Sequence, residues 1–167
     1  MQGTGENMIE RKKIKELISE SLNELVRYDG ELITRNVREE CINHRFAIYL
    51  ERNLKTFNIH GYDVDLEYNK NKSRPKEVLL DQGKNLKAIR PDIIVHKRIR
   101  NDSNLIAFEI KKSYTTKYDY EKIIGLLRKP YEYSYGCLVS YLPQKDYTRV
   151  KLLSSGGDQS ETIKILS

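Results

Sequence analysis

The amino-acid sequence predicts one α/β domain, residues 1–167, in which helices flank a mixed central β-sheet. Two long segments near the N-terminus carry apolar residues at helical spacing, and short runs rich in β-branched residues follow them. The core order is helix, three strands, helix and strand. It predicts antiparallel strands early in the sheet and a parallel pair where the later helix crosses over. A chain of 167 residues is long enough for one domain with its own core.

The predicted helices and strands follow one another without internal repeats. We expect the first helix to end at Asp29-Gly30 and the last helix to stop before Pro130, because proline cannot continue a helix. Serine and glycine at residues 154–157 predict the turn of a C-terminal hairpin. In chain order, the expected elements are helices at 10–28 and 36–57, strands at 63–68, 77–80, 90–95 and 105–111, a helix at 118–128, and strands at 135–142, 148–153 and 162–166.

Composition and charge favour an intracellular protein with a polyanionic partner. The chain has 30 basic and 24 acidic residues, a net charge of +6, which favours association with a polyanion. Cys41 and Cys137 lie in apolar stretches without metal-binding spacing, so we expect both to be buried, reduced thiols of a cytoplasmic protein. No apolar run is long enough to span a bilayer, and the N-terminus has no signal-peptide pattern. Residues 1–7 are expected to be disordered.

The most informative feature is a pair of charged motifs on two consecutive predicted strands. Asp92 stands at the start of the first strand, and the two-residue period of the second puts Glu109 and Lys111 on one face. If the strands pair, two carboxylates and one ammonium converge at one end of the sheet. Two convergent carboxylates are a usual way to hold Mg²⁺, and a lysine beside a metal-bound water is suited to activating or positioning a nucleophile. The alternative is a solvated strand face that happens to carry Glu and Lys.

These motifs resemble the signature of the PD-(D/E)xK nuclease superfamily, which places Pro-Asp on one strand and Glu-x-Lys on the next. Pro91-Asp92 and Glu109-Ile110-Lys111 match it without substitution. Residues 39–51 and 65–69 are similar to the first core helix and first strand of a subgroup of small, stand-alone, largely uncharacterised bacterial members. The resemblance spans about residues 37–142. It implies a restriction-endonuclease-like αβββαβ core, to which this chain adds an N-terminal helix and a C-terminal hairpin.

The resemblance also implies a function, that of a Mg²⁺-dependent nuclease in which Mn²⁺ can substitute. The expected reaction is hydrolysis of a nucleic-acid phosphodiester bond, with DNA as the expected substrate and a 5′ phosphate as product. Asp92, Glu109 and the Ile110 carbonyl would hold the metal. Glu39 would bind it directly or through water. Lys111 would orient or deprotonate the attacking water, whose pKa the metal lowers.

Glu39 has two interpretations that the sequence leaves open. At about 100° per residue it projects in the same direction as Phe46 and Leu50, toward the core, where a carboxylate needs a partner such as a shared metal site. Alternatively, Asn36 at the N-cap and Glu39 three residues later form a capping box, which is a purely structural use. Glu40 is the fallback acidic candidate.

Basic residues near the motif are the candidates for contact with nucleic acid. Lys97, Arg98 and Arg100 lie in the loop between the two motif strands, and Lys112 follows the second strand. Basic loops beside tyrosines suit capture of a phosphate backbone, although an ordinary solvated turn explains each cluster equally well. Lys122 on the following helix has the same two interpretations: contact with a phosphate, or the polar face of an amphipathic helix.

Other functions stay open at this point because a fold does not settle a function. The main alternative is a catalytically silent module that binds nucleic acid or protein within a prokaryotic defence or repair assembly. A homodimer or a larger assembly is compatible with the sequence. No membrane partner is expected.

Overall fold

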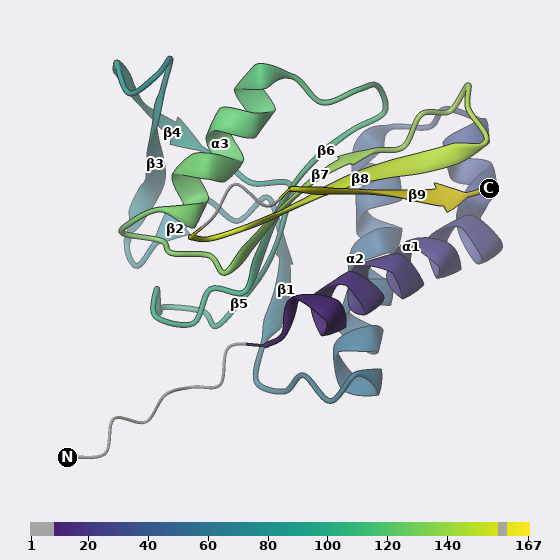
Figure 1. Cartoon of the computed structure of the whole chain (residues 1–167), viewed down its shortest axis with the longest axis horizontal. Helices are drawn as coiled ribbons and strands as arrows, with labels where there is room; N and C mark the ends of the chain where they lie inside the picture. Colours follow the sequence, from purple (N-terminus) through teal and green to yellow (C-terminus); the bar gives the residue numbers. More distant parts are fainter. Residues whose placement is uncertain (1–8, 157–159) are drawn as a thin grey trace.

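The computed structural model describes residues 9–156 and 160–167, which form a mixed α/β structure of three helices and nine strands (Figure 1). The elements are α1 (Arg11–Thr34), α2 (Glu39–Thr56), β1 (Asp63–Leu66), β2 (Lys70–Asn71), β3 (Arg74–Leu80), β4 (Asn85–Ile89), β5 (Ile93–His96), β6 (Ile106–Lys111), α3 (Lys117–Leu127), β7 (Tyr135–Ser140), β8 (Tyr147–Ser154) and β9 (Glu161–Leu166). Residues 1–7, expected to be disordered, lie outside the described residues.

A six-stranded sheet in the order β1-β5-β6-β7-β8-β9 forms the centre of the domain. Every neighbouring pair is antiparallel except β6 and β7, which run parallel because α3 connects them as a crossover. The prediction of a mixed sheet with an early antiparallel part and a later parallel pair is therefore confirmed. The short strand expected at 77–80 is part of the longer β3, which belongs to a separate three-stranded sheet, β2-β3-β4.

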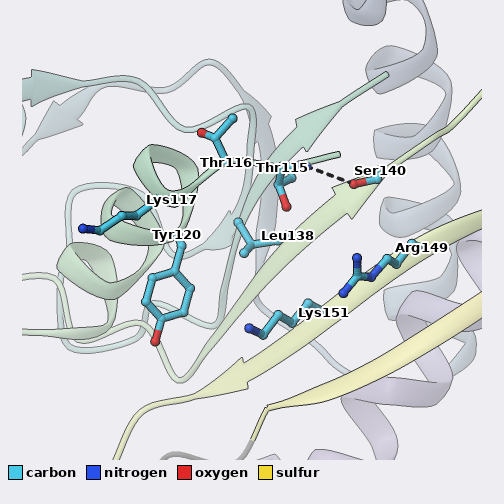
Figure 2. A pocket seen from close by; sticks show the side chains of 8 residues that line it. All are labelled: Thr115, Thr116, Lys117, Tyr120, Leu138, Ser140, Arg149 and Lys151. Atoms are coloured by element: carbon cyan, nitrogen blue, oxygen red, sulfur yellow. Dashed lines mark hydrogen bonds between the residues drawn. The ribbon is translucent and has the colours of Figure 1, made fainter. Parts of the chain in front are cut away.

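Helices cover the two faces of the central sheet differently. The helices α1 and α2 pack together on one face, whereas α3 packs on β6 and β7 from the other face and also contacts β3 (Figure 1). Figure 2 shows the first turn of α3, with Lys117 and Tyr120, beside the residues of β7 and β8 that face the same way. The arrangement leaves a cavity between α3 and β8.

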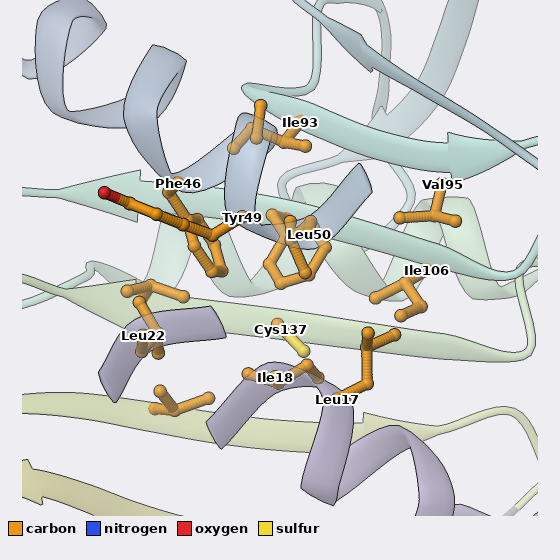
Figure 3. Close-up of a cluster of buried hydrophobic side chains, with 14 of the residues drawn as sticks. Leu17, Ile18, Leu22, Phe46, Tyr49, Leu50, Ile93, Val95, Ile106 and Cys137 are labelled. Atoms are coloured by element: carbon orange, nitrogen blue, oxygen red, sulfur yellow. The ribbon is translucent and has the colours of Figure 1, made fainter. Parts of the chain in front are cut away.

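The main hydrophobic core lies between the sheet and the pair α1 and α2 (Figure 3). Phe46 of α2 packs edge-on against Phe108 of β6, with ring centres 5.5 Å apart and planes at 87°. Residues that alternate with Phe108 along β6, including Glu109, point to the face that α3 covers. The period of two residues thus directs the apolar half of the motif strand to the core and its charged half toward α3.

Two helix boundaries differ from the prediction. Asp29 leaves helical geometry (φ −130°, ψ 17°), yet α1 continues to Thr34, so Asp29-Gly30 produces a kink and not an end. The kink is stabilised because the Asp29 carboxylate accepts a hydrogen bond from Nε of Arg45 at 2.8 Å. The second helix begins at Glu39, three residues later than predicted, because Asn36 adopts a positive φ of 54°.

The two cysteines have different environments. Cys137 is fully buried in the core, and burial raises the pKa of its thiol, as expected for an inert structural residue. Cys41 is exposed on α2, so the prediction that it is buried is wrong; both are free thiols. Among the described residues, no helix has the length and apolar character needed to cross a membrane.

Candidate active site

Asp92 and Glu109 lie side by side at one end of the central sheet. The register of β5 and β6 pairs Ile93 with Phe108, so the preceding residue Asp92 falls beside Glu109 on the face that α3 covers. The backbone N–H of Asp92 donates to the Phe108 carbonyl at 3.1 Å. In return, Oδ2 of Asp92 accepts a hydrogen bond from the backbone N–H of Ile110 at 2.6 Å. This exchange extends the pairing by one residue before the start of β5 and fixes the Asp92 carboxylate against β6.

Glu109 is completely buried, which is rare for a carboxylate. Its Oε2 accepts a hydrogen bond from Nζ of Lys122 on α3 at 2.6 Å, and the Lys122 side chain is only 13% exposed. Its Oε1 is also buried and has no hydrogen-bond partner among residues 9–156 and 160–167. Burial, followed by the charge of Asp92, raises the pKa of Glu109 to about 8, although Lys122 opposes the shift.

Lys111 is surrounded by carboxylates. Its ammonium lies 3.9 Å from Oδ1 of Asp119, a buried residue near the start of α3. Partial burial alone would lower its pKa, but the negative charges of Asp119, Asp92 and Glu39 outweigh burial and raise it. Lys111 therefore remains an ammonium at neutral pH, and at 38% side-chain exposure it stays accessible to a ligand.

Glu39 lies at the same end of the sheet, at the start of α2. Its Oε2 accepts a hydrogen bond from the backbone N–H of Lys112 at 3.0 Å. Burial raises the pKa of its carboxyl group; Lys111 opposes this effect and Asp92 adds to it. The capping-box interpretation is wrong, because Arg38 is the N-cap residue and no side chain caps α2. The fallback candidate, Glu40, is exposed.

Sequence reasoning missed Asp119 and gave too little weight to Lys122. Asp119 closes a capping box with Thr116 at the start of α3, so its position is fixed by the helix end. Lys122 follows three residues later on the same side of α3 and reaches Glu109. The Thr116-x-x-Asp119 pattern was visible in the sequence. The close approach of α3 to the sheet, which brings both side chains to β6, was not.

The predicted phosphate-binding cations of the loop between β5 and β6 lie away from these carboxylates. Asp92 precedes β5 and Glu109 lies near the end of β6, so the loop that joins the two strands is at the opposite end of both. From Asp92 to His96 the chain extends about 13 Å. Arg98 forms two hydrogen bonds with Asp65, at 2.8 and 2.6 Å.

The other predicted cations also have partners within the chain. Arg100 pairs with Asp102 at 2.6 Å, and Nζ of Lys97 lies 5.3 Å from the ring centre of Tyr62. Lys112 is close to the carboxylate cluster, but its Nζ donates to the Val37 carbonyl at 3.1 Å. The loop cations therefore lie at the far end of the motif strands from the carboxylates, because strand direction carries them there; their contact with nucleic acid stays a prediction.

A cavity of about 340 Å³ opens between α3 and β8 (Figure 2), and none of the clustered carboxylates lines it. It adjoins the motif strand because Ser140 and Leu138 of β7 pair with Lys111 and Glu109. Oγ of Ser140 accepts a hydrogen bond from the backbone N–H of Thr115 at 3.3 Å. The polar residues that line the cavity are Thr115, Thr116, Lys117, Tyr120, Ser140, Arg149 and Lys151.

The donor atoms at this site are the oxygens that a hard divalent cation prefers. Asp92 and Glu109 supply carboxylates, and the Ile110 carbonyl points to the same side of β6 as its N–H, toward Asp92. As arranged, no group of three or more Asp, Glu, His or Cys side chains in the described part of the chain is close enough to hold a metal ion. Oε1 of Glu109, which has no hydrogen-bond partner among the described residues, is the oxygen with a lone pair free to coordinate a cation.

Comparison with known proteins gives no identification. No family model, no curated protein and no solved structure matches the chain.

Proposed function

We propose that this chain is a metal-dependent nuclease of the PD-(D/E)xK type with a restriction-endonuclease-like core. The order α2, β1, β5, β6, α3, β7 supports the core assignment, since it reproduces helix, three strands, helix and strand once the β2-β3-β4 sheet is set aside as an insertion. The observation that carries the function is the convergence of Glu39, Asp92 and Glu109 with Lys111 at one end of the sheet.

The roles of the residues follow from their positions. Asp92, Glu109 and the Ile110 carbonyl would hold Mg²⁺ or Mn²⁺, and Glu39 would bind it directly or through water. When bound, the metal polarises the phosphate and lowers the pKa of a water molecule. Lys111 orients the attacking water and stabilises developing negative charge on the phosphate. In the metal-free protein Lys122 donates a hydrogen bond to Oε2 of Glu109, and this contact must break before Oε2 can coordinate a metal.

A specific observation favours the competing function, a nucleic-acid-binding module without catalysis. Lys122 already satisfies one oxygen of Glu109, as it would in a purely structural ion pair. The two functions differ in their need for Lys111. Catalysis requires its ammonium, whereas a structural ion pair between Glu109 and Lys122 does not involve Lys111.

The experiment is a nuclease assay on single-stranded DNA, double-stranded DNA and RNA with Mg²⁺, Mn²⁺ or Ca²⁺. We expect cleavage with Mg²⁺ and Mn²⁺, and binding without turnover in Ca²⁺, whose coordination geometry is looser. Lys111→Ala should abolish cleavage while Mg²⁺ still binds in calorimetry. Asp92→Ala should abolish cleavage, and Glu109→Ala should abolish both. Lys87→Ala, on the exposed strand β4, is the matched control and should cleave like wild type.

Two outcomes would contradict the proposal. Equal activity of wild type and Lys111→Ala would show that a contaminating nuclease is responsible. Binding of nucleic acid without cleavage of any substrate, in every metal, would assign the chain to the silent binding module.

A further inference from the structure

The sheet face beyond α3 carries cations in an alternating pattern. Along β8, Thr148, Val150 and Leu152 are buried toward the core, whereas Arg149 and Lys151 point to the face that carries the cavity. On β9, Lys164 pairs with Arg149 and is exposed on the same face. We call this surface the β8–β9 shelf: Arg149, Lys151 and Lys164 with the tyrosines that contact them, Tyr114, Tyr120 and Tyr147.

Each cation of the shelf lies over a tyrosine ring. Arg149 is 5.8 Å from the ring centre of Tyr114, and Lys151 is 5.2 Å from that of Tyr120. Lys164 is 4.6 Å from the ring centre of Tyr147. Within residues 9–156 and 160–167, no carboxylate lies within 4.0 Å of these three cations, in contrast to Arg98 with its partner Asp65. The shelf therefore presents positive charge that the described protein does not neutralise.

The shelf is continuous with the candidate active site. One row of paired residues crosses four strands, from Lys111 on β6 through Ser140 and Arg149 to Lys164 on β9. At about 4.8 Å between neighbouring strands, this row is about 14 Å long, the rise of roughly four stacked nucleotides. The cavity between α3 and β8 lies along the row and offers the hydroxyl groups of Thr115 and Ser140.

We propose that the β8–β9 shelf is the binding track for single-stranded nucleic acid, an inference that rests on the proposed nuclease function. Phosphates of the strand lie against Arg149, Lys151 and Lys164, and bases stack on the exposed rings of Tyr114 and Tyr120. A positively charged surface with interspersed aromatic rings suits a single strand, because its bases are available for stacking, whereas those of a duplex already stack on one another. The track leads the scissile phosphate toward Lys111.

The test is fluorescence anisotropy of labelled oligo-dT and oligo-U on the full chain in EDTA, over a range of salt concentrations. The double substitution Arg149→Gln/Lys151→Gln should weaken binding at least about tenfold and reduce the slope of log K against log salt by about 1.4, since each lost phosphate contact contributes about 0.7 for a single strand. Lys164→Gln, on an exposed position, should reduce the slope by about 0.7. Tyr120→Leu should weaken binding about tenfold at an unchanged slope, because stacking is not ionic.

The matched control is Lys12→Gln/Lys55→Gln, which removes the same charge from exposed positions of α1 and α2, on the opposite face of the sheet, and should leave binding at the wild-type level. The loop variant Lys97→Gln/Arg100→Gln tests the other predicted binding cations in the same assay. Circular dichroism of each variant verifies the fold. Wild-type affinity of the shelf variant, a loss confined to the loop variant, or tighter binding of duplex than of single strands would each overturn the proposal. If wild type cleaves nucleic acid but the shelf variant binds as tightly as wild type, the binding-track proposal is refuted and the nuclease proposal is not. If the shelf substitutions weaken binding but no metal supports cleavage by wild type, the nuclease proposal is refuted and the binding-track proposal is not.

Discussion

Replacing Glu109 with glutamine should change how the stability of the metal-free protein depends on pH. Glutamine keeps the shape of the side chain and an oxygen that can accept the hydrogen bond from Lys122, but it cannot ionise. In wild type, burial and then Asp92 raise the pKa of Glu109 from 4.5 to about 8. Between these two pH values the native state binds more protons than the unfolded state, so the free energy of unfolding falls as pH rises.

The magnitude follows from the width of that window. Over the interval from pH 4.5 to about 8, at about 1.36 kcal/mol per pH unit, the free energy of unfolding of wild type falls by on the order of 3–5 kcal/mol. At pH 4 the two proteins should differ little in stability from this cause. At pH 9 the Glu109→Gln variant should be the more stable protein by on the order of 3–5 kcal/mol, because only wild type must keep a buried anion.

Urea unfolding in EDTA at pH values from 4 to 9 measures this difference. Glu51→Gln, an exposed carboxylate on α2, is the control and should follow the wild-type curve. Adding Mg²⁺ at pH 8 should stabilise wild type but not Glu109→Gln, since a ligand that binds only the native state raises the free energy of unfolding. Parallel curves for wild type and Glu109→Gln across the whole range would refute the reasoning, because they would mean that Glu109 ionises as an ordinary surface carboxylate does.

Two further predictions concern packing and hydrogen bonding around the site. Asp92→Ala should lower the free energy of unfolding by about 1–3 kcal/mol because it leaves the Ile110 N–H without its acceptor, whereas Asp92→Asn keeps an acceptor oxygen and should restore most of that loss; equal urea midpoints for the two variants would contradict this. Gly136→Ala should cost about 1–3 kcal/mol, because its Cβ would lie 2.3 Å from Cγ2 of Ile123 and push α3 off the sheet. Gly30→Ala, where a Cβ meets nothing within 4 Å, is its control, and equal melting temperatures would exclude the clash.

The parts of the structure that sequence could predict are those set by local periodicity. Alternation along β6 was enough to place Glu109 and Lys111 on one face and Phe108 in the core. A wrong outcome came from the same kind of reasoning on α2. Cys41 lies in an apolar stretch and is expected to be buried, yet it is exposed, because the sheet covers only the side of α2 that carries Phe46.

The parts that sequence could not predict depend on how elements rotate and approach each other. The pairing of Lys122 with Glu109 requires α3 to lie close to the sheet, which Gly136 permits because it has no Cβ to meet Ile123. The helical period of α3 buries Asp119, Ile123 and Leu126 on one side, but it does not encode how closely that side approaches the sheet. The position of Arg98 at the far end of the motif strands, in contrast, follows from strand direction alone. Closeness in sequence to the motif does not imply closeness to the carboxylates.

The energetic pattern of the site argues for chemistry more than for binding alone. Glu39, Asp92 and Glu109 come from three separate segments, and burial raises the pKa of all three carboxyl groups. Gathering desolvated acids in this way opposes folding, and Lys111 and Lys122 only partly compensate. A module that only binds nucleic acid needs cations, such as those of the proposed β8–β9 track. It gains nothing from buried carboxylates that repel phosphate. The acidic cluster beside the proposed basic track is the arrangement that the proposed metal-assisted phosphodiester hydrolysis requires, since that reaction brings a cation and a phosphate together.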